Sequence, residues 1–302
     1  MTNWLRENRQ TIARSLGSLL AVILLVVLLK EESGDEITSA LKRVSIWYFL
    51  GALLTMLISR LFVVSRWHVL LRSAGIDISF WRTATLTFTG LFSSNFLPTT
   101  IGGDVVRLAG AMQLGYDRAI CLASMVADRL IGMAGMLVTL PFGLIPVLSL
   151  GNTGLQAISF ASLFQKGLDF VKRIFSTFAI WFKKPLALVM SLFSTFGNMI
   201  FIFLAIFLLI NGMGHHVSYW LIAGLWSLTY FVTLIPISVN GFGVQELSLT
   251  FLLSKIGGLD HSESLAIAVL IRVLFIVSSL PGAFFLPSIL AAMNNKQPAS
   301  ND

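Results

Sequence analysis

The chain has 302 residues, of which 56% are hydrophobic and 12% are charged. A soluble globular protein has about 45–50% apolar and about 25% charged residues, so this composition excludes that class. The formal net charge is +7. In a membrane protein we assign such a charge to basic residues that flank the spans and set their orientation, and we expect no nucleic-acid partner.

Apolar runs long enough to cross a bilayer, which takes about 17–25 residues, recur along the whole chain. The predicted fold is therefore an all-α integral membrane protein, a polytopic helical bundle that forms a single transmembrane domain over 1–302. The predicted spans are 14–29, 45–64, 119–140, 144–165, 187–210, 217–235 and 262–287.

Basic residues near the first spans indicate the orientation of the chain. Arginines precede the first apolar run and no small-residue cleavage site follows it, so we expect a retained signal anchor. A second basic cluster, at 60–82, follows the second span and is predicted to be cytoplasmic. A third lies in 166–184, which is predicted to be an amphipathic helix at the membrane interface; a simple linker is the alternative. The second cluster consists of Arg60, Arg66, Arg72 and Arg82.

Two segments rich in proline and glycine interrupt the apolar sequence: "LPTTIGGDVVRL" at 97–108 and "IPISVNGFGVQEL" at 235–247. Proline ends a preceding helix, and glycine permits positive φ and close approach of backbones. Irregular backbone survives at membrane depth only where protein covers it or where it lines a water-filled cavity. The two segments are therefore predicted to be the tips of broken, re-entrant elements at 83–115 and 217–257.

The tips divide the chain into two pseudo-repeats, about 1–143 and 144–295. In each, an acid at the tip precedes an arginine, by 25 positions from Asp104 to Arg129 and by 26 from Glu246 to Arg272. A Pro-Gly break follows each arginine, at 140–143 and 280–282. An odd number of crossings per half predicts that the second repeat is inverted. Inverted repeats with broken helices are typical of transporters whose site lies near the midplane.

Charged side chains at bilayer depth cost about 2.5–3.5 kcal/mol each on insertion scales and indicate function. Arginine presents a planar fork of donors that suits phosphate or carboxylate, and the helices that begin near 104 and 244 offer N–H groups to an anion. The acids would hold the arginines or carry protons. The predicted substrate-binding residues are Asn95, Gly102, Gly103, Asp104, Arg107, Asp128, Arg129, Asn240, Gly241, Gly243, Glu246 and Arg272.

Two alternatives stay open for these charges. In the first, each arginine forms an ion pair with a nearby acid, such as Arg129 with Asp128, and these pairs only hold the helices of the bundle together. Arg107 would instead extend to the headgroups at the membrane surface. The four histidines show no metal-ligand spacing, Cys121 is the only cysteine, and no nucleotide-binding or nucleophile motif occurs. We therefore expect no metal, no cofactor and no enzymatic activity.

The segments "SRWHVLLRSAGIDISFWRT", "NFLPTTIGGDVVRL", "VADRLIGM" and "IPISVNGFGVQEL" resemble the lysylphosphatidylglycerol synthase transmembrane-region family. This family includes the UPF0104 proteins and the flippase domain of multiple-peptide-resistance factors. The resemblance implies a lipid-translocating domain, with the charged residues above on the family's membrane-depth positions. Gln245 departs from it, because many relatives carry arginine there. The sequence ends at Asp302 without the family's soluble aminoacyl-transferase domain, so a lysyl-lipid substrate is not implied.

The expected function is that of a lipid flippase. We expect a multi-pass protein of a cell membrane, the inner membrane of a bacterium. Its substrate would be an anionic phospholipid or a polyprenyl-phosphate-linked glycan, whose phosphate meets the arginines and the helix N-termini. The alternative is an accessory membrane protein that presents a lipid to a partner glycosyltransferase without moving it. A membrane-embedded transferase is disfavoured, because no catalytic motif is found.

Overall fold

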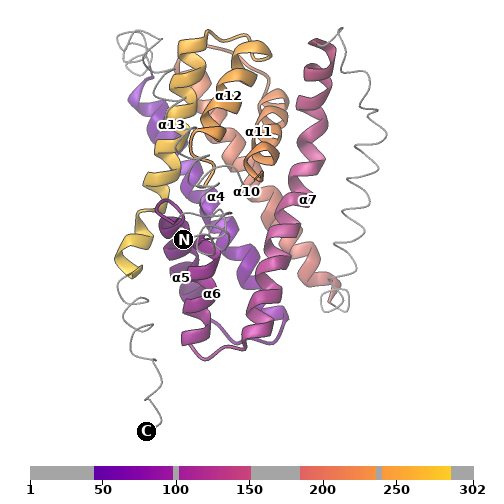
Figure 1. Cartoon of the computed structure of the whole chain (residues 1–302), viewed down its shortest axis with the longest axis vertical. Coiled ribbons are helices and arrows are strands. Elements are labelled where there is room, and N and C mark those ends of the chain that lie inside the picture. Colours follow the sequence, from indigo (N-terminus) through magenta and orange to yellow (C-terminus); the bar gives the residue numbers. More distant parts are fainter. Residues whose placement is uncertain (1–43, 98–101, 151–183, 236–239, 287–302) are drawn as a thin grey trace, which may run out of the picture.

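The computed structural model describes residues 44–97, 102–150, 184–235 and 240–286. Over these ranges the chain forms eight helices and no strand (Figure 1). The all-helical fold of a polytopic membrane protein is thus confirmed. The predicted helices at 14–29 and 166–184 lie outside the described residues. Four helices are long and apolar enough to cross a membrane: Ile46–Ser73, Arg118–Ser149, Pro185–Gly212 and His261–Leu286.

The centre of the bundle is built on two long helices, α4 (Ile46–Ser73) and α10 (Pro185–Gly212), which pack against each other along their length. Their apolar side chains join those of α13 (His261–Ser279) in one core cluster. The outer faces also carry large apolar side chains, such as Trp47, which is 78% exposed, and Phe193, which is 71% exposed. A surface of this kind suits contact with lipid.

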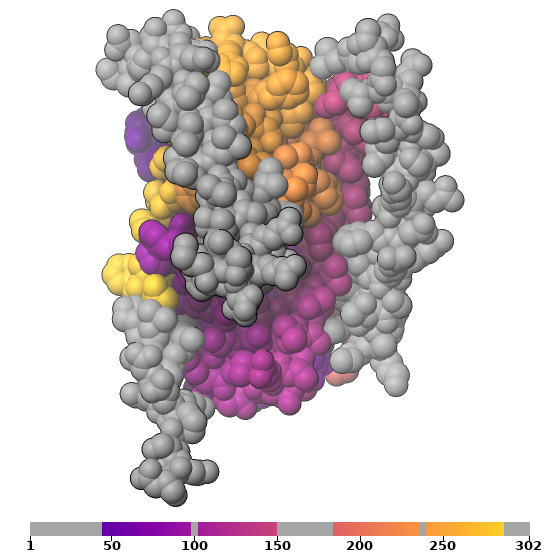
Figure 2. All heavy atoms as spheres, in the orientation of Figure 1, coloured from indigo at the N-terminus to yellow at the C-terminus, as the bar shows by residue number. Residues whose placement is uncertain are grey.

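Each predicted broken element consists of two short helices. In the first half these are α5 (Phe80–Ser93) and α6 (Gly102–Gln113), and in the second half α11 (Tyr219–Thr233) and α12 (Val244–Lys255). Their lengths of 14, 12, 15 and 12 residues are below the ~20 residues that a span needs. In Figures 1 and 2 the first pair lies in the lower part of the molecule and the second in the upper part.

The glycines of the two tips have different roles. Gly241 and Gly243 have φ values of 73° and 78°, as predicted for a turn that favours glycine. Gly102 and Gly103 instead lie in the first turn of α6, and neither has a positive φ value. A Cβ atom on Gly103 would lie 2.3 Å from the carbonyl oxygen of Gly90. Gly103 therefore serves close contact between α5 and α6.

The predicted helix break at 140–143, and with it a new span from 144, is wrong. Helix α7 (Arg118–Leu150) continues through Pro141 and Pro146. Proline is tolerated in a membrane helix where neighbouring helices compensate for the lost hydrogen bond, and here α7 packs against α11. The predicted boundary between the repeats thus falls inside a helix. At the second predicted break, α13 ends at Ser279, but only Leu280 separates it from residues 281–286, which are helical again.

The contact between α7 and α11 gives a first prediction. A Cβ atom on Gly224 would lie 1.9 Å from the backbone nitrogen of Gly143. We expect Gly224→Ala to lower the free energy of unfolding by about 1–3 kcal/mol, because the helices must move apart. In Gly51→Ala the added carbon would meet only Leu208 Cδ1, at 3.5 Å. Thermal unfolding in detergent compares the two, and equal melting temperatures would contradict a backbone contact at Gly224.

Candidate functional site: an arginine-lined cavity

A cavity of about 320 Å³ lies between α4, α5, α6, α7, α11, α12 and α13. It draws its lining from both halves of the chain. Four predicted residues at the tips do not line it: Gly102, Gly103, Gly243 and Glu246. Glu246 nevertheless contacts a lining residue, Arg272. Eight predicted residues do line it: Asn95, Asp104, Arg107, Asp128, Arg129, Asn240, Gly241 and Arg272.

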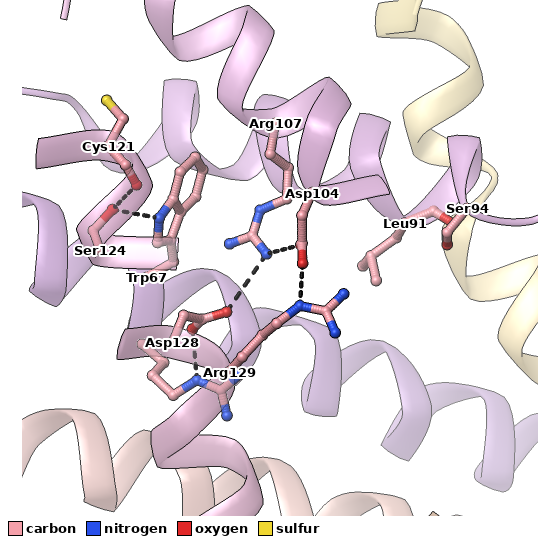
Figure 3. A network of polar contacts seen from close by, with 10 residues as sticks. Trp67, Leu91, Ser94, Asp104, Arg107, Cys121, Ser124, Asp128 and Arg129 are labelled. Atoms are coloured by element: carbon pink, nitrogen blue, oxygen red, sulfur yellow. Dashed lines mark hydrogen bonds and ion pairs between the residues drawn. The ribbon is translucent and has the colours of Figure 1, made fainter. Parts of the chain in front are cut away.

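Asp104 in the first turn of α6 lies between two arginines (Figure 3). Its Oδ1 atom accepts a hydrogen bond of 3.2 Å from Arg107 Nη1, and its Oδ2 atom accepts one from Arg129 Nε. The predicted role of this acid in holding Arg129 is confirmed. Arg107 is 7% exposed, so it does not extend to the membrane surface as the alternative required.

Asp128 on α7 is only 3% exposed and holds two other arginines. Arg66 Nε donates to its Oδ1 atom over 2.7 Å, and Arg107 Nη1 approaches its Oδ2 atom at 3.5 Å. The structure shows no ion pair between Asp128 and its neighbour Arg129, so the pairing considered above is wrong. Adjacent residues of a helix do not face each other, and the partners of Asp128 come instead from α4 and α6.

The second half contains a matching pair. Glu246, in the first turn of α12, is 2% exposed, and its Oε1 atom accepts a hydrogen bond from Arg272 Nε. Its Oε2 atom accepts from the backbone N–H of Gly243 over 2.7 Å, and Arg272 Nη2 donates to the Gly241 carbonyl oxygen over 3.3 Å. The protein's own carboxylate therefore occupies the N-terminus of α12, which we had expected to meet a bound headgroup.

Two cavity residues, Arg60 and Arg66, were assigned wrongly from the sequence. The sequence predicts that they belong to a cytoplasmic cluster, but α4 continues to Ser73 and leaves both arginines 8% exposed inside the bundle. The available signal was the apolar sequence that resumes after each of them, "LFVV" and "WHVLL". A charge with apolar residues on both sides is embedded in a span, whereas a charge at a membrane surface terminates one.

Arg60 is held in the cavity without an acid. Its Nε atom donates to Ser278 Oγ over 3.3 Å, and its guanidinium carbon lies 4.7 Å from the centre of the Phe275 ring. Among the described residues no carboxylate forms an ion pair with it. An aromatic face attracts a guanidinium but leaves its charge uncompensated. Arg60 thus keeps a full positive charge in the cavity.

Arg107 and Arg272 are also stacked on aromatic rings. The guanidinium carbon of Arg107 lies 4.1 Å from the centre of the Trp67 ring, and that of Arg272 lies 4.3 Å from the centre of the Phe242 ring. Figure 3 shows the Arg107 guanidinium beside Trp67 and Asp104. The Nε and Nη2 atoms of Arg107 are buried and have no hydrogen-bond partner in the described part of the chain. These donors therefore lack an acceptor within the described part of the bundle.

The charge of the cavity favours an anion. Five arginines and two aspartates line it, and Glu246 contacts Arg272 from behind. Over these residues the positive charges exceed the negative ones by two. In a medium of low dielectric constant such an excess attracts an anionic group strongly. The described residues contain no group of three His, Cys, Asp or Glu side chains placed to hold a metal ion.

Comparison with known proteins gives two matches. The family model described as the lysylphosphatidylglycerol synthase TM region matches residues 14–282. A UPF0104 membrane protein of Methanothermobacter thermautotrophicus is 32% identical over 150 residues, which is 49% of this chain and 40% of the relative. The matched part thus covers less than half of the relative's length. The residues of the cavity lie inside the range of the family model.

Proposed function

Because this chain belongs to the lysylphosphatidylglycerol synthase transmembrane-region family, we propose that it is a flippase that moves an anionic lipid across a cell membrane. The lipid is an anionic phospholipid or a polyprenyl-phosphate-linked glycan, and the membrane is the inner membrane of a bacterium. Transport needs no catalytic residue and no cofactor in this proposal. The headgroup enters the cavity, and the acyl chains stay in the surrounding lipid.

The observation that carries this proposal is the excess of buried arginines in the cavity. Charged groups taken out of water are costly unless they are paired, and a purely structural network would satisfy all of them. Arg60 has no acid, and two nitrogens of Arg107 have no hydrogen-bond partner among the described residues. Arginine binds phosphate with charge-assisted hydrogen bonds that are roughly twice as strong as neutral ones. A phosphate headgroup in the cavity would supply the negative charge that Arg60 lacks.

The arrangement of the short helices supports transport rather than simple binding. Figure 1 shows the connection between α6 and α7 at the lower end of the molecule and that between α12 and α13 at the upper end. Short helix pairs that reach the centre from opposite ends are what inverted repeats require. The lower end also gathers exposed basic residues, so we place it in the cytoplasm: Arg72, Arg82, Arg118 and Lys184.

A labelling experiment tests this topology. In a Cys121→Ala background, Arg118→Cys places a thiol at the first residue of α7, and Asp260→Cys places one between α12 and α13; both positions are exposed. We expect a membrane-impermeant maleimide to reach position 118 from the cytoplasm and position 260 from outside. Labelling of both from one side would contradict the inverted repeat. Labelling from opposite but exchanged sides would reverse the proposed orientation.

Transport itself is tested in vesicles that contain the purified protein and a fluorescent phosphatidylglycerol. An added quencher that cannot cross the membrane removes the outer-leaflet signal, and lipid movement exposes the rest. We expect faster quenching with the protein than in protein-free vesicles, and unchanged activity in Arg72→Ala, whose side chain is exposed and lies outside the cavity. Equal rates with and without protein would contradict transport. Lipid retained by such an inactive protein would support the accessory role beside a glycosyltransferase.

A further inference from the structure

The cavity contains two more arginines than the described residues provide carboxylates to pair with them. From this excess we propose that it selects a lipid whose phosphate headgroup carries two negative charges, and that Arg60 makes the distinction. A phosphate monoester at a lipid headgroup has this charge, whereas a phosphodiester carries one. The inference rests on the proposed role of the cavity in binding a lipid headgroup and specifies the class of that headgroup.

Three arginines can be matched one to one with acids. Arg129 pairs with Asp104, Arg66 with Asp128 and Arg272 with Glu246. Two cations then remain in the lining of the cavity. These are Arg107 on α6, which shares the two aspartates with the paired arginines, and Arg60 on α4.

The acids offer little to a positively charged headgroup. Each oxygen of Asp104 accepts from an arginine, and so does each oxygen of Asp128. The two oxygens of Glu246 accept from Arg272 and from the backbone of Gly243. A headgroup with an ammonium group would therefore meet an excess of positive charge and acids that already accept from arginines. This excludes zwitterionic and aminoacylated lipids as preferred ligands.

Arg60 differs from the other cavity arginines because an aromatic ring and a hydroxyl hold it instead of an acid. Its Nε atom donates to Ser278, and its Nη atoms make no hydrogen bond to the described residues. Arg60 lines the cavity, and no carboxylate among the described residues shares its charge. A phosphate monoester carries about −1.5 to −2 charges at neutral pH, with a second pKa near 6. The second of these charges matches Arg60, and the first matches Arg107.

The test compares two lipids with identical acyl chains, phosphatidic acid and phosphatidylmethanol, whose headgroups differ by one methyl ester. Binding to the purified protein in detergent is measured by native mass spectrometry and by the shift in melting temperature. We expect phosphatidic acid to bind about tenfold more tightly at about pH 8, a difference of about 1.4 kcal/mol. The preference should disappear at about pH 5, where the monoester has taken up one proton and carries a single negative charge, like the diester. Equal affinities at the higher pH would overturn the proposal.

Variants assign the preference to Arg60. We expect Arg60→Gln to bring the two affinities together and Arg60→Lys to keep most of the preference, since lysine retains the charge. Arg82→Gln is the matched control, because Arg82 is exposed and lies outside the cavity; it should keep the full preference. An unchanged preference in Arg60→Gln would overturn the role of Arg60. Should that variant fail to fold, the pH dependence of the unmodified protein still decides the headgroup charge.

Two further ligands test the assignment. One has a zwitterionic headgroup, and the other is a soluble phosphate. Phosphatidylethanolamine should bind more weakly than phosphatidic acid, and equal binding would overturn the selection by charge. Inorganic phosphate should not displace phosphatidic acid at equal concentration; displacement would identify a site for soluble phosphate and overturn the lipid assignment. The transport proposal and the inference on charge can be contradicted separately. Movement of phosphatidylglycerol without a preference for the monoester contradicts only the inference on charge. A preference without movement contradicts only transport.

Discussion

Replacing Asp128 with asparagine is expected to lower the free energy of unfolding by about 3–5 kcal/mol, as for other buried ion pairs that lose one partner. Asp128 is 3% exposed and neutralises charge on Arg66, at 2.7 Å, and on Arg107, at 3.5 Å. Asparagine keeps the shape of the side chain but removes its charge, so two guanidinium groups are left in the bundle with one aspartate fewer. Thermal or denaturant unfolding in detergent measures the effect.

A second variant shows that the loss comes from charge. Asp128→Asn combined with Arg66→Gln removes the acid together with its closest partner and should recover part of the stability. The exposed pair Arg72 and Asp77 is the control, because the side chain of Asp77 is 93% exposed. Surface ion pairs contribute about 0–1 kcal/mol, so Asp77→Asn should be nearly neutral. Equal destabilisation by the two asparagine variants would contradict a buried ion pair at Asp128.

Removing the Arg129 side chain is expected to slow lipid movement about 100-fold, equivalent to about 2.7 kcal/mol of barrier height, while the protein stays folded. The side chain of Arg129 is 38% exposed, and its acid, Asp104, also contacts Arg107. Arg129→Ala therefore leaves no buried acid alone but removes a phosphate donor. Arg129→Lys keeps the charge but loses the planar fork, so partial transport is expected.

Arg272→Ala is the variant to compare with Arg129→Ala. Arg272 is 10% exposed at its side chain, and the carboxylate it holds, that of Glu246, is 2% exposed. Its removal strands a buried acid, so both stability and transport should fall. Vesicle transport and melting temperature, measured side by side, separate the two arginines. A loss of stability in Arg129→Ala as large as in Arg272→Ala would contradict a ligand-binding role for Arg129.

Composition and the lengths of the apolar runs were sufficient to predict the helical membrane fold, and the two proline- and glycine-rich segments fall where pairs of short helices meet. The break at 140–143 was predicted wrongly because proline and glycine in a membrane helix can indicate either the end of the helix or a close contact with another helix. On an isolated helix Pro141 predicts an end, but Gly143 contacts the backbone of Gly224 in α11. This contact joins segments far apart in the chain, and no local pattern indicates it. The inverted relation of the halves stays a prediction.

The site was predicted where an acid and an arginine recur at matched spacing, at Asp104 with Arg129 and at Glu246 with Arg272. It was missed at Arg60 and Arg66, because a basic residue late in an apolar run resembles the end of a span. Only the partners of these arginines, Ser278 for Arg60 and Asp128 for Arg66, show that both lie within the bundle. Those partners are 218 and 62 positions away, beyond the reach of a spacing argument.

The two arginines of α4 also bear on how the chain enters the membrane during synthesis. An arginine at the centre of a span costs about 2.5–3.5 kcal/mol on insertion scales, and each leucine offsets only about 0.3–0.6 kcal/mol. The acid that neutralises Arg66 and the hydroxyl that holds Arg60 belong to α7 and α13, which are translated later. We therefore expect α4 alone to insert inefficiently and to settle at its final depth only when α7 arrives. The positive charge of the cavity thus delays the assembly of the bundle that encloses it.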